Sequence, residues 1–230
     1  AEFGKLQKSP SVVNFWMPDG YKDTPADTVA LRRLMVDSLD RILSASDFSK
    51  DHVLDSIESK LFGLGVESHT VASHEFSLLY ATTRSILYTL DSGHFHPTET
   101  VSSKISAILQ FVDGLLLHVS RGVRWDSDHV VTYDDELINI ASEIVQNGYE
   151  ERVHIGLDYF DASINRIASW VIGMRNVRKS LLRASLMPAD LVKGFETSGD
   201  FTSRLALQEE FKHLPYTEVW NYYCLKNHVP

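Results

Sequence analysis

The chain has 230 residues, and its 22 basic and 31 acidic side chains give a formal net charge of −9. Apolar residues make up 43% and charged residues 23%, which is ordinary globular usage and excludes a disordered chain. The acidic balance excludes a basic nucleic-acid footprint, and no apolar run is long enough to cross a bilayer. We therefore expect neither nucleic acid nor a membrane as a partner.

A single cysteine, Cys224, excludes an internal disulfide framework. We find no secretory signal in the first residues, and we assign no structure to Ala1 through Gly4. These observations together predict a protein of a reducing, cytoplasmic compartment.

Five short segments rich in Val, Ile, Leu and aromatic residues predict buried strands. Their shortness, and the Gly, Asp and Ser residues beside them, favour strands over turns of helix. The segments are residues 11–17, 53–60, 85–91, 115–119 and 152–158.

Helical patterns separate these strands. Thr24 and Pro25 predict a helix start with a hydroxyl cap and a proline in the first turn, followed by an apolar stripe from Leu31 to Leu43. Further helices are expected over residues 75–84, 98–112, 134–145 and 162–177, with Thr98 and Asp134 as N-caps.

The region beyond residue 177 shows only helical pieces, broken by Pro188, Gly199 and Pro215. Strands that alternate with helices predict a parallel sheet with right-handed crossovers. The expected order is therefore five strand–helix units followed by a helical tail.

Polar side chains that bind metals stand at or just after the ends of the predicted strands. In parallel strand–helix arrays, reactive groups gather at the carboxyl ends of the strands. The candidate metal ligands at these ends are Glu58, Asp91, His94, His118, Asp126, Asp128 and Asp158, and Trp16 and Lys60 also stand at strand ends.

Each of these residues also has an ordinary explanation. An Asp at a strand end is typical of a turn or helix cap, a lone His such as His118 is typical of a hydrogen-bonded core, and Glu58 with Lys60 could be a surface ion pair. These explanations weaken together, because five carboxylates at one end of a sheet repel unless cations neutralise them. The sequence therefore predicts a metal site.

The donor types indicate which ion the site holds. Carboxylates with one or two imidazoles suit Mn²⁺, Mg²⁺ or Co²⁺, with Zn²⁺ also possible. Two divalent ions, with Lys60 beside them, balance five carboxylates better than one ion does.

Long stretches of the chain, among them Ile57–Gly63 (IESKLFG) and Leu90–Glu99 (LDSGHFHPTE), match the pattern of one known family. The chain resembles L-rhamnose isomerase from about Phe3 to about His228. The other stretches are residues 11–20, 115–131 and 152–176.

The resemblance implies an α/β fold, a TIM (β/α)₈ barrel like that of xylose isomerase. It implies aldose–ketose isomerisation of L-rhamnose to L-rhamnulose by a homo-oligomer, a tetramer in the family. The family chain begins well before Ala1, with three further strands. We therefore expect a fragment: an incomplete barrel of about five strand–helix units over residues 1–176, and a C-terminal helical tail over residues 177–230.

The resemblance also implies roles for single residues. The first, structural metal site consists of Glu58, Asp91, His118 and Asp158. The second consists of His94, Asp126 and Asp128, with Asp91 as the bridge. Mn²⁺ is the expected ion at both, with Co²⁺ or Zn²⁺ as alternatives.

The same resemblance places Lys60 near the sugar O1 and gives Trp16 a place in the substrate pocket. The implied catalytic residues are Lys60, His94, Asp126 and Asp128. Two other functions stay open: a two-metal hydrolase of related fold, and a non-catalytic half-barrel that serves as an interaction module. The route of isomerisation, by hydride shift or through an enediol, also stays open.

Overall fold

The structure is a computed structural model that describes residues 1–17, 19–45, 47–60, 68–96, 98–123, 128–160 and 163–229. Five parallel strands form one sheet in the order β1-β2-β3-β4-β7, so neighbours in sequence are neighbours in space. The strands are β1 (Ser11–Phe15), β2 (Val53–Glu58), β3 (Leu87–Asp91), β4 (Leu115–Val119) and β7 (Val153–Leu157). The five predicted strands and their parallel order are confirmed.

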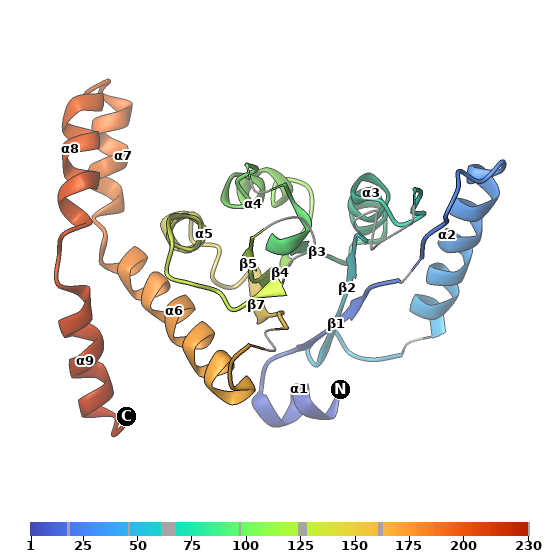
Figure 1. Cartoon of the computed structure of the whole chain (residues 1–230), viewed down its shortest axis with the longest axis horizontal. Helices are drawn as coiled ribbons and strands as arrows, with labels where there is room; N and C mark the ends of the chain where they lie inside the picture. The colour runs from blue at the N-terminus through green and yellow to red at the C-terminus, as the bar shows by residue number, and fades with distance from the viewer. Residues whose placement is uncertain are drawn as a thin grey trace.

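The sheet is an open half-barrel rather than a closed one. Figure 1 shows the helices that follow β1 to β4 lying side by side along one side of the sheet, while α1 and α6 flank its open side. These helices are α1 (Glu2–Gln7), α2 (Thr28–Ala45), α3 (His74–Arg84), α4 (Ser102–Ile108), α5 (Asp135–Gln146) and α6 (Arg166–Leu186).

Three short elements stand at the carboxyl end of the sheet. A single turn, η1 (Ser92–His94), follows β3 directly. An antiparallel pair, β5 (Arg121–Gly122) and β6 (Asp128–His129), follows β4 and was not predicted. These elements carry His94 and Asp128, two of the predicted site residues.

The two faces of the sheet differ in chemistry because successive side chains of a strand point to opposite faces. Apolar residues such as Ile57, Tyr88, Leu90 and Leu117 are buried with the helices in one hydrophobic core. On β2 and β3 the second face mixes polar residues, Ser56 and Glu58 among them, with apolar ones such as Leu87. The second face of the sheet therefore carries buried polar side chains on β2 and β3 beside apolar ones.

Helix α2 begins later than its sequence predicted. The structure starts it at Thr28, and the carboxylate of Asp27 accepts a hydrogen bond of 2.8 Å from the Ala30 N–H. Thr24 and Pro25 lie ahead of the helix, because Asp27 offers a cap one turn closer to the apolar stripe.

Helix α4 is shorter than predicted at both ends. The hydroxyl of Thr98 pairs with the Nδ1 atom of His96 at 2.6 Å, so it does not cap the helix. At the other end, the guanidinium of Arg152 donates to the carbonyls of Leu109 and Val112, 2.8 Å each. These bonds satisfy carbonyls that leave the helix after Ile108.

The other helix starts depend on side-chain caps. The predicted cap of α5 is confirmed, since Asp134 accepts a hydrogen bond of 3.0 Å from the Leu137 N–H. Helix α6 begins at Arg166, where Asn165 caps it. The first residues, for which no structure was predicted, form α1 and bury Gly4.

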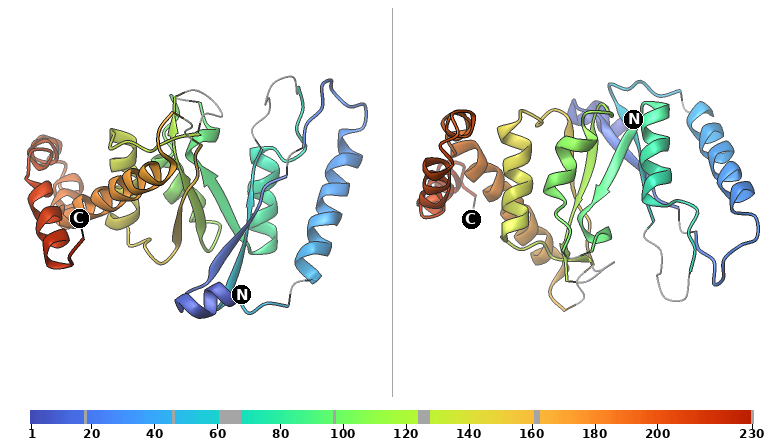
Figure 2. Two further views of the ribbon diagram at one scale, coloured as in Figure 1. Left: turned by 60° about the horizontal axis from the view of Figure 1, so that its bottom comes forward. Right: turned by 90° about the horizontal axis from the view of Figure 1, so that it is seen from above.

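The C-terminal region is helical, as predicted. The predicted breaks fall between successive helices: Pro188 between α6 and α7, Gly199 between α7 and α8, and Pro215 between α8 and α9. The three new helices are α7 (Ala189–Thr197), α8 (Phe201–Phe211) and α9 (Tyr216–Lys226). Figure 2 shows these last helices standing together beyond the end of the sheet. Helix α6 runs unbroken through residue 176, and the division of the chain there stays a prediction.

No helix among the described residues combines the length and apolarity that crossing a membrane requires.

Candidate metal centre

Four strands bring one side chain each to the same edge of the half-barrel. Glu58 ends β2, Asp91 ends β3, His118 stands in β4 and Asp158 directly follows β7. In the register of the sheet, Asp91 pairs with His118, and His118 with Gly156, which is two residues before Asp158. The period of two along each strand therefore directs these side chains to one face and one rim.

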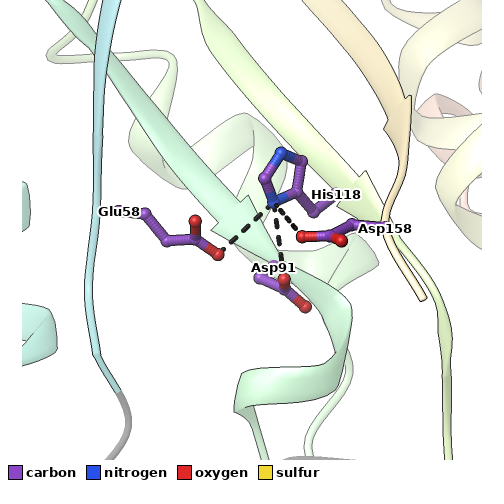
Figure 3. Close-up of side chains that lie close together, drawn as sticks. All are labelled: Glu58, Asp91, His118 and Asp158. Carbon is purple, nitrogen blue, oxygen red and sulfur yellow. Dashed lines mark hydrogen bonds and ion pairs between the residues drawn. The ribbon is translucent and has the colours of Figure 1, made fainter. Parts of the chain in front are cut away.

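The Nδ1 atom of His118 lies at the centre of this cluster (Figure 3). It is 3.2 Å from Asp158 Oδ2, 3.4 Å from Glu58 Oε1 and 3.5 Å from Asp91 Oδ2. One donor atom from each of the four residues lies within 4.8 Å of every other. Glu58 and Asp91 are buried, whereas the side chain of Asp158 is about half exposed and opens the cluster to solvent.

Three carboxylates in this space require a compensating cation. Burial would lower the pKa of His118, but its bonds to Asp91 and Glu58 outweigh burial and raise the pKa to about 10. Without a metal, the imidazole is therefore protonated at neutral pH and holds the carboxylates together. Burial raises the pKa of Glu58, against the bond from His118. Burial also acts to raise the pKa of Asp91, but bonds from His118 and the Gly93 N–H lower it.

The cluster fits a divalent cation in geometry and in charge. An octahedral ion with bonds of about 2.1 Å separates adjacent ligands by about 3.0 Å and opposite ligands by about 4.2 Å. The observed separations of 3.2 to 3.5 Å and the 4.8 Å limit come close to these values. When a divalent ion replaces the proton of His118, the charge of the cluster falls from −2 to −1.

His94 lies beside this cluster. Its Nδ1 atom is 3.7 Å from Glu58 Oε1 and its Nε2 atom is 3.9 Å from Asp91 Oδ2. Within the described part of the chain, His94 Nδ1 is buried without a hydrogen-bond partner. The turn η1 thus places an imidazole next to the cluster, on the side of Glu58 and Asp91.

Asp128 approaches the same rim from β6. A Cβ atom added to Gly93 would lie 2.6 Å from Asp128 Oδ1 and 3.2 Å from Asp91 Oδ1. Both carboxylates therefore flank Gly93, and the missing side chain at residue 93 gives Asp128 the space it occupies. Asp126, the third predicted ligand of the second site, lies outside the described residues.

Lys60 is buried just beyond the carboxyl end of β2. Its Nζ atom donates a hydrogen bond of 2.5 Å to the carbonyl of Asp19, and its backbone N–H donates to the carbonyl of Ala72 at 3.0 Å. The carboxylate of Asp19 in turn accepts from the Val71 N–H. Trp16, one residue after β1, is 38% exposed and can meet a ligand.

Sequence reasoning missed one polar residue that touches the cluster. Asn14, on β1, donates a hydrogen bond of 2.5 Å to Glu58 Oε2. An amide inside the apolar run SVVNFWM was the available signal, because a buried amide needs partners.

The fold and the site define an α/β half-barrel with a carboxylate–histidine cluster at the carboxyl ends of its parallel strands. The whole chain, residues 1–230, matches the family L-rhamnose isomerase (RhaA). The chain belongs to the L-rhamnose isomerase family.

Curated relatives with the name L-rhamnose isomerase match the chain over all of its 230 residues. It is 56% identical to the protein from Rhodopirellula baltica, of which it covers 54%. It is 55% identical to that from Yersinia pseudotuberculosis and 56% identical to that from Salmonella paratyphi B, covering 55% of each. The chain thus spans about half the length of the curated relatives it matches.

Proposed function

We propose that this chain carries the metal-binding half of an isomerase that interconverts L-rhamnose and L-rhamnulose. The observation that supports this proposal is the position of His118 Nδ1, 3.2 to 3.5 Å from three carboxylates, in a chain of this family. The sugar is inferred from the relatives, which are L-rhamnose isomerases by name.

We propose that two divalent ions, preferably Mn²⁺, bind at this rim. Glu58, Asp91, His118 and Asp158 would hold the first. His94, Asp126 and Asp128 would hold the second, with Asp91 shared between the two. When bound, such ions stabilise the negative charge that develops on sugar oxygens O1 and O2 as hydrogen moves between C2 and C1.

The chain's own residues would supply orientation and charge. A fixed ammonium stabilises an oxygen that becomes negative in the transition state, which is the role we propose for Lys60 at O1. The bond to the Asp19 carbonyl restrains that ammonium in a single position. Trp16, partly exposed beside the rim, would pack on the sugar and orient it.

An assay tests this proposal directly. Purified full-length protein that carries this chain is stripped of metal, supplied with Mn²⁺ and incubated with L-rhamnose, and the ketose is quantified. Ketose formation that stops on chelation supports the proposal. Metal binding without turnover favours the non-catalytic half-barrel. The same protein is also incubated with a phosphodiester. Cleavage of the phosphodiester, without conversion of L-rhamnose, favours the two-metal hydrolase.

We also propose that the protein is a homo-oligomer, as the family resemblance predicts, with a tetramer as the expected state. Strands β1 and β7 are the edges of the described sheet, and edge strands present unpaired backbone groups. Helix α6 exposes Ile167 and Trp170, which are 69% and 52% exposed. Analytical ultracentrifugation measures the oligomeric state of the protein. A monomer at micromolar concentration contradicts this part of the proposal.

The cytoplasmic location predicted from the sequence stays part of the proposal. Its support is the single cysteine, Cys224, which is a buried free thiol.

A further inference from the structure

Three polar side chains form a hydrogen-bonded chain that ends on Glu58. Ser56 pairs with Thr89 at 2.6 Å, Thr89 donates to Asn14 Oδ1 at 2.7 Å, and Asn14 donates to Glu58 Oε2 at 2.5 Å. These three hydrogen bonds connect the neighbouring strands β1, β2 and β3. They lie on the second face of the sheet, where Asn14 stands level with Ser56, and Glu58 with Thr89.

The Glu58 carboxylate, at the end of this series of hydrogen bonds, determines which group donates in each bond. An ionised carboxylate only accepts hydrogen bonds, so Asn14 must present its NH₂ group to Glu58. Its carbonyl oxygen then faces Thr89, whose hydroxyl must donate. The Thr89 oxygen is left to accept from Ser56. All three bonds therefore point toward the carboxylate.

We propose that Ser56, Thr89 and Asn14 are positioning residues that orient Glu58 as a one-oxygen metal ligand. The inference deepens the proposed function and rests on its metal centre. Asn14 occupies Oε2, and Oε1 faces the cluster, 3.4 Å from His118 Nδ1 and 3.7 Å from His94 Nδ1. Glu58 thus offers one oxygen to an ion, at a position that its strand and the relay define together.

The burial of the relay supports this role. Ser56 is 0% and Thr89 1% exposed, and burying hydroxyls in place of apolar side chains costs free energy unless they are bonded. Partners of metal ligands typically change metal affinity by about 10- to 100-fold when they are removed. A relay that only filled space would leave metal affinity unchanged.

The test compares Thr89→Val with Thr89→Ser, because the second variant keeps the hydroxyl. Purified, metal-stripped protein is titrated with MnCl₂ by isothermal calorimetry, and the melting temperature of the metal-free protein is measured in parallel. We expect Thr89→Val to raise the Kd for Mn²⁺ about tenfold and Thr89→Ser to change it less than threefold. Asn14→Ala, on the half-buried edge strand β1, should raise the Kd at least as much.

A double-mutant cycle tests whether the residues act in series. Ser56→Ala as a single substitution should raise the Kd for Mn²⁺. Added to Thr89→Val, it should cause no further increase, since Ser56 acts through Thr89. An unchanged Kd in both Thr89→Val and Asn14→Ala overturns the relay. The relay is also overturned if Thr89→Val and Thr89→Ser raise the Kd equally and both lower the melting temperature. That result indicates a packing role for Thr89.

The two proposals fail in different ways. If the unsubstituted protein binds Mn²⁺ and the relay variants bind it less tightly, but L-rhamnose is not converted, the relay stands and the proposed isomerase is wrong. If L-rhamnose is converted in a Mn²⁺-dependent reaction and the relay variants keep the Kd, the isomerase stands and the relay is wrong. If the unsubstituted protein does not bind Mn²⁺, both are wrong.

Discussion

Tyr159 and Gly173 make the close contact that seats helix α6 beside the end of β7. The Tyr159 hydroxyl donates a hydrogen bond of 2.8 Å to the carbonyl of Ser169, one turn before Gly173. A Cβ atom at residue 173 would lie only 2.2 Å from the Tyr159 Oη atom. The glycine therefore allows the buried tyrosine to lie directly against the helix backbone.

Gly173→Ala should accordingly destabilise the protein. The added methyl group displaces Tyr159 and breaks its bond to α6, and overpacking of this kind costs about 1–3 kcal/mol. Urea unfolding measures the loss. Gly194→Ala, inside α7, is the matched control, because no atom lies within 4 Å of its added Cβ. It should stabilise by about 0.5–1 kcal/mol, since alanine favours helix. Equal stability of both variants contradicts the proposed packing.

Substitution of Asp91 should weaken both proposed metal sites, whereas substitution of Asp158 should weaken one. Asp91 is the proposed bridge, so Asp91→Asn should weaken both Mn²⁺ sites by at least about tenfold, whereas Asp158→Asn should weaken only the first. Calorimetric titration resolves the two sites by stoichiometry. Glu209→Gln, on exposed helix α8, is the control and should bind like the unsubstituted protein. If Asp91→Asn leaves one site intact, Asp91 is not the bridge.

Mn²⁺ affinity should rise with pH because the ion displaces the proton of His118. The pKa of His118 is raised to about 10, so the proton is present at neutral pH and is lost only as the pH rises through that value. Each pH unit below about 10 should therefore weaken binding by up to about tenfold. Titrations at pH 7 in buffers of different ionisation enthalpy count the protons released, and we expect about one. Release of no proton contradicts the assignment.

The same raised pKa has a consequence for the stability of the metal-free protein. The folded pKa of His118 is above the ordinary value of about 6.5, so the protonated imidazole contributes stability that is complete below pH 6.5. This contribution decreases as the pH rises through 10. The melting temperature of chelator-treated protein should therefore decrease over this range more than that of a His118→Gln variant.

Gly93→Ala should impair the second ion site. Its Cβ atom would lie 2.6 Å from Asp128 Oδ1, so the carboxylate must move away from residue 93. We expect turnover and affinity for the second Mn²⁺ to fall about tenfold or more, with a smaller effect on the melting temperature. Gly122→Ala is the matched control on the neighbouring β5, where the nearest atom is 3.7 Å away. Unchanged turnover in Gly93→Ala would remove Asp128 from the site.

The sequence by itself was sufficient to predict the strands and the residues at their ends. Short apolar runs bounded by turn residues favour strands, and their alternation with helices predicts a parallel sheet. Parallel strands end at a common edge, so chain order alone brought Glu58, Asp91, His118 and Asp158 together. This part of the site depends on local pattern and on a general rule of topology.

The helix ends were less predictable, because several polar residues compete for each cap. Thr24 and Thr98 have the right chemistry, yet Asp27 lies closer to the stripe of α2 and His96 engages the Thr98 hydroxyl. Such competition is decided by side-chain positions that a linear pattern does not contain.

Only the tertiary structure decided which side chains contact the candidate metal centre. The register between strands aligns Asn14 with Ser56 and Glu58 with Thr89, and it joins residues up to 75 positions apart in one relay. The sequence contains these residues without their register, because a shift of one position moves every side chain of a strand to the other face. The residues that can bind a metal are therefore readable from the sequence, whereas the residues of the proposed relay are brought together by the packing of β1, β2 and β3.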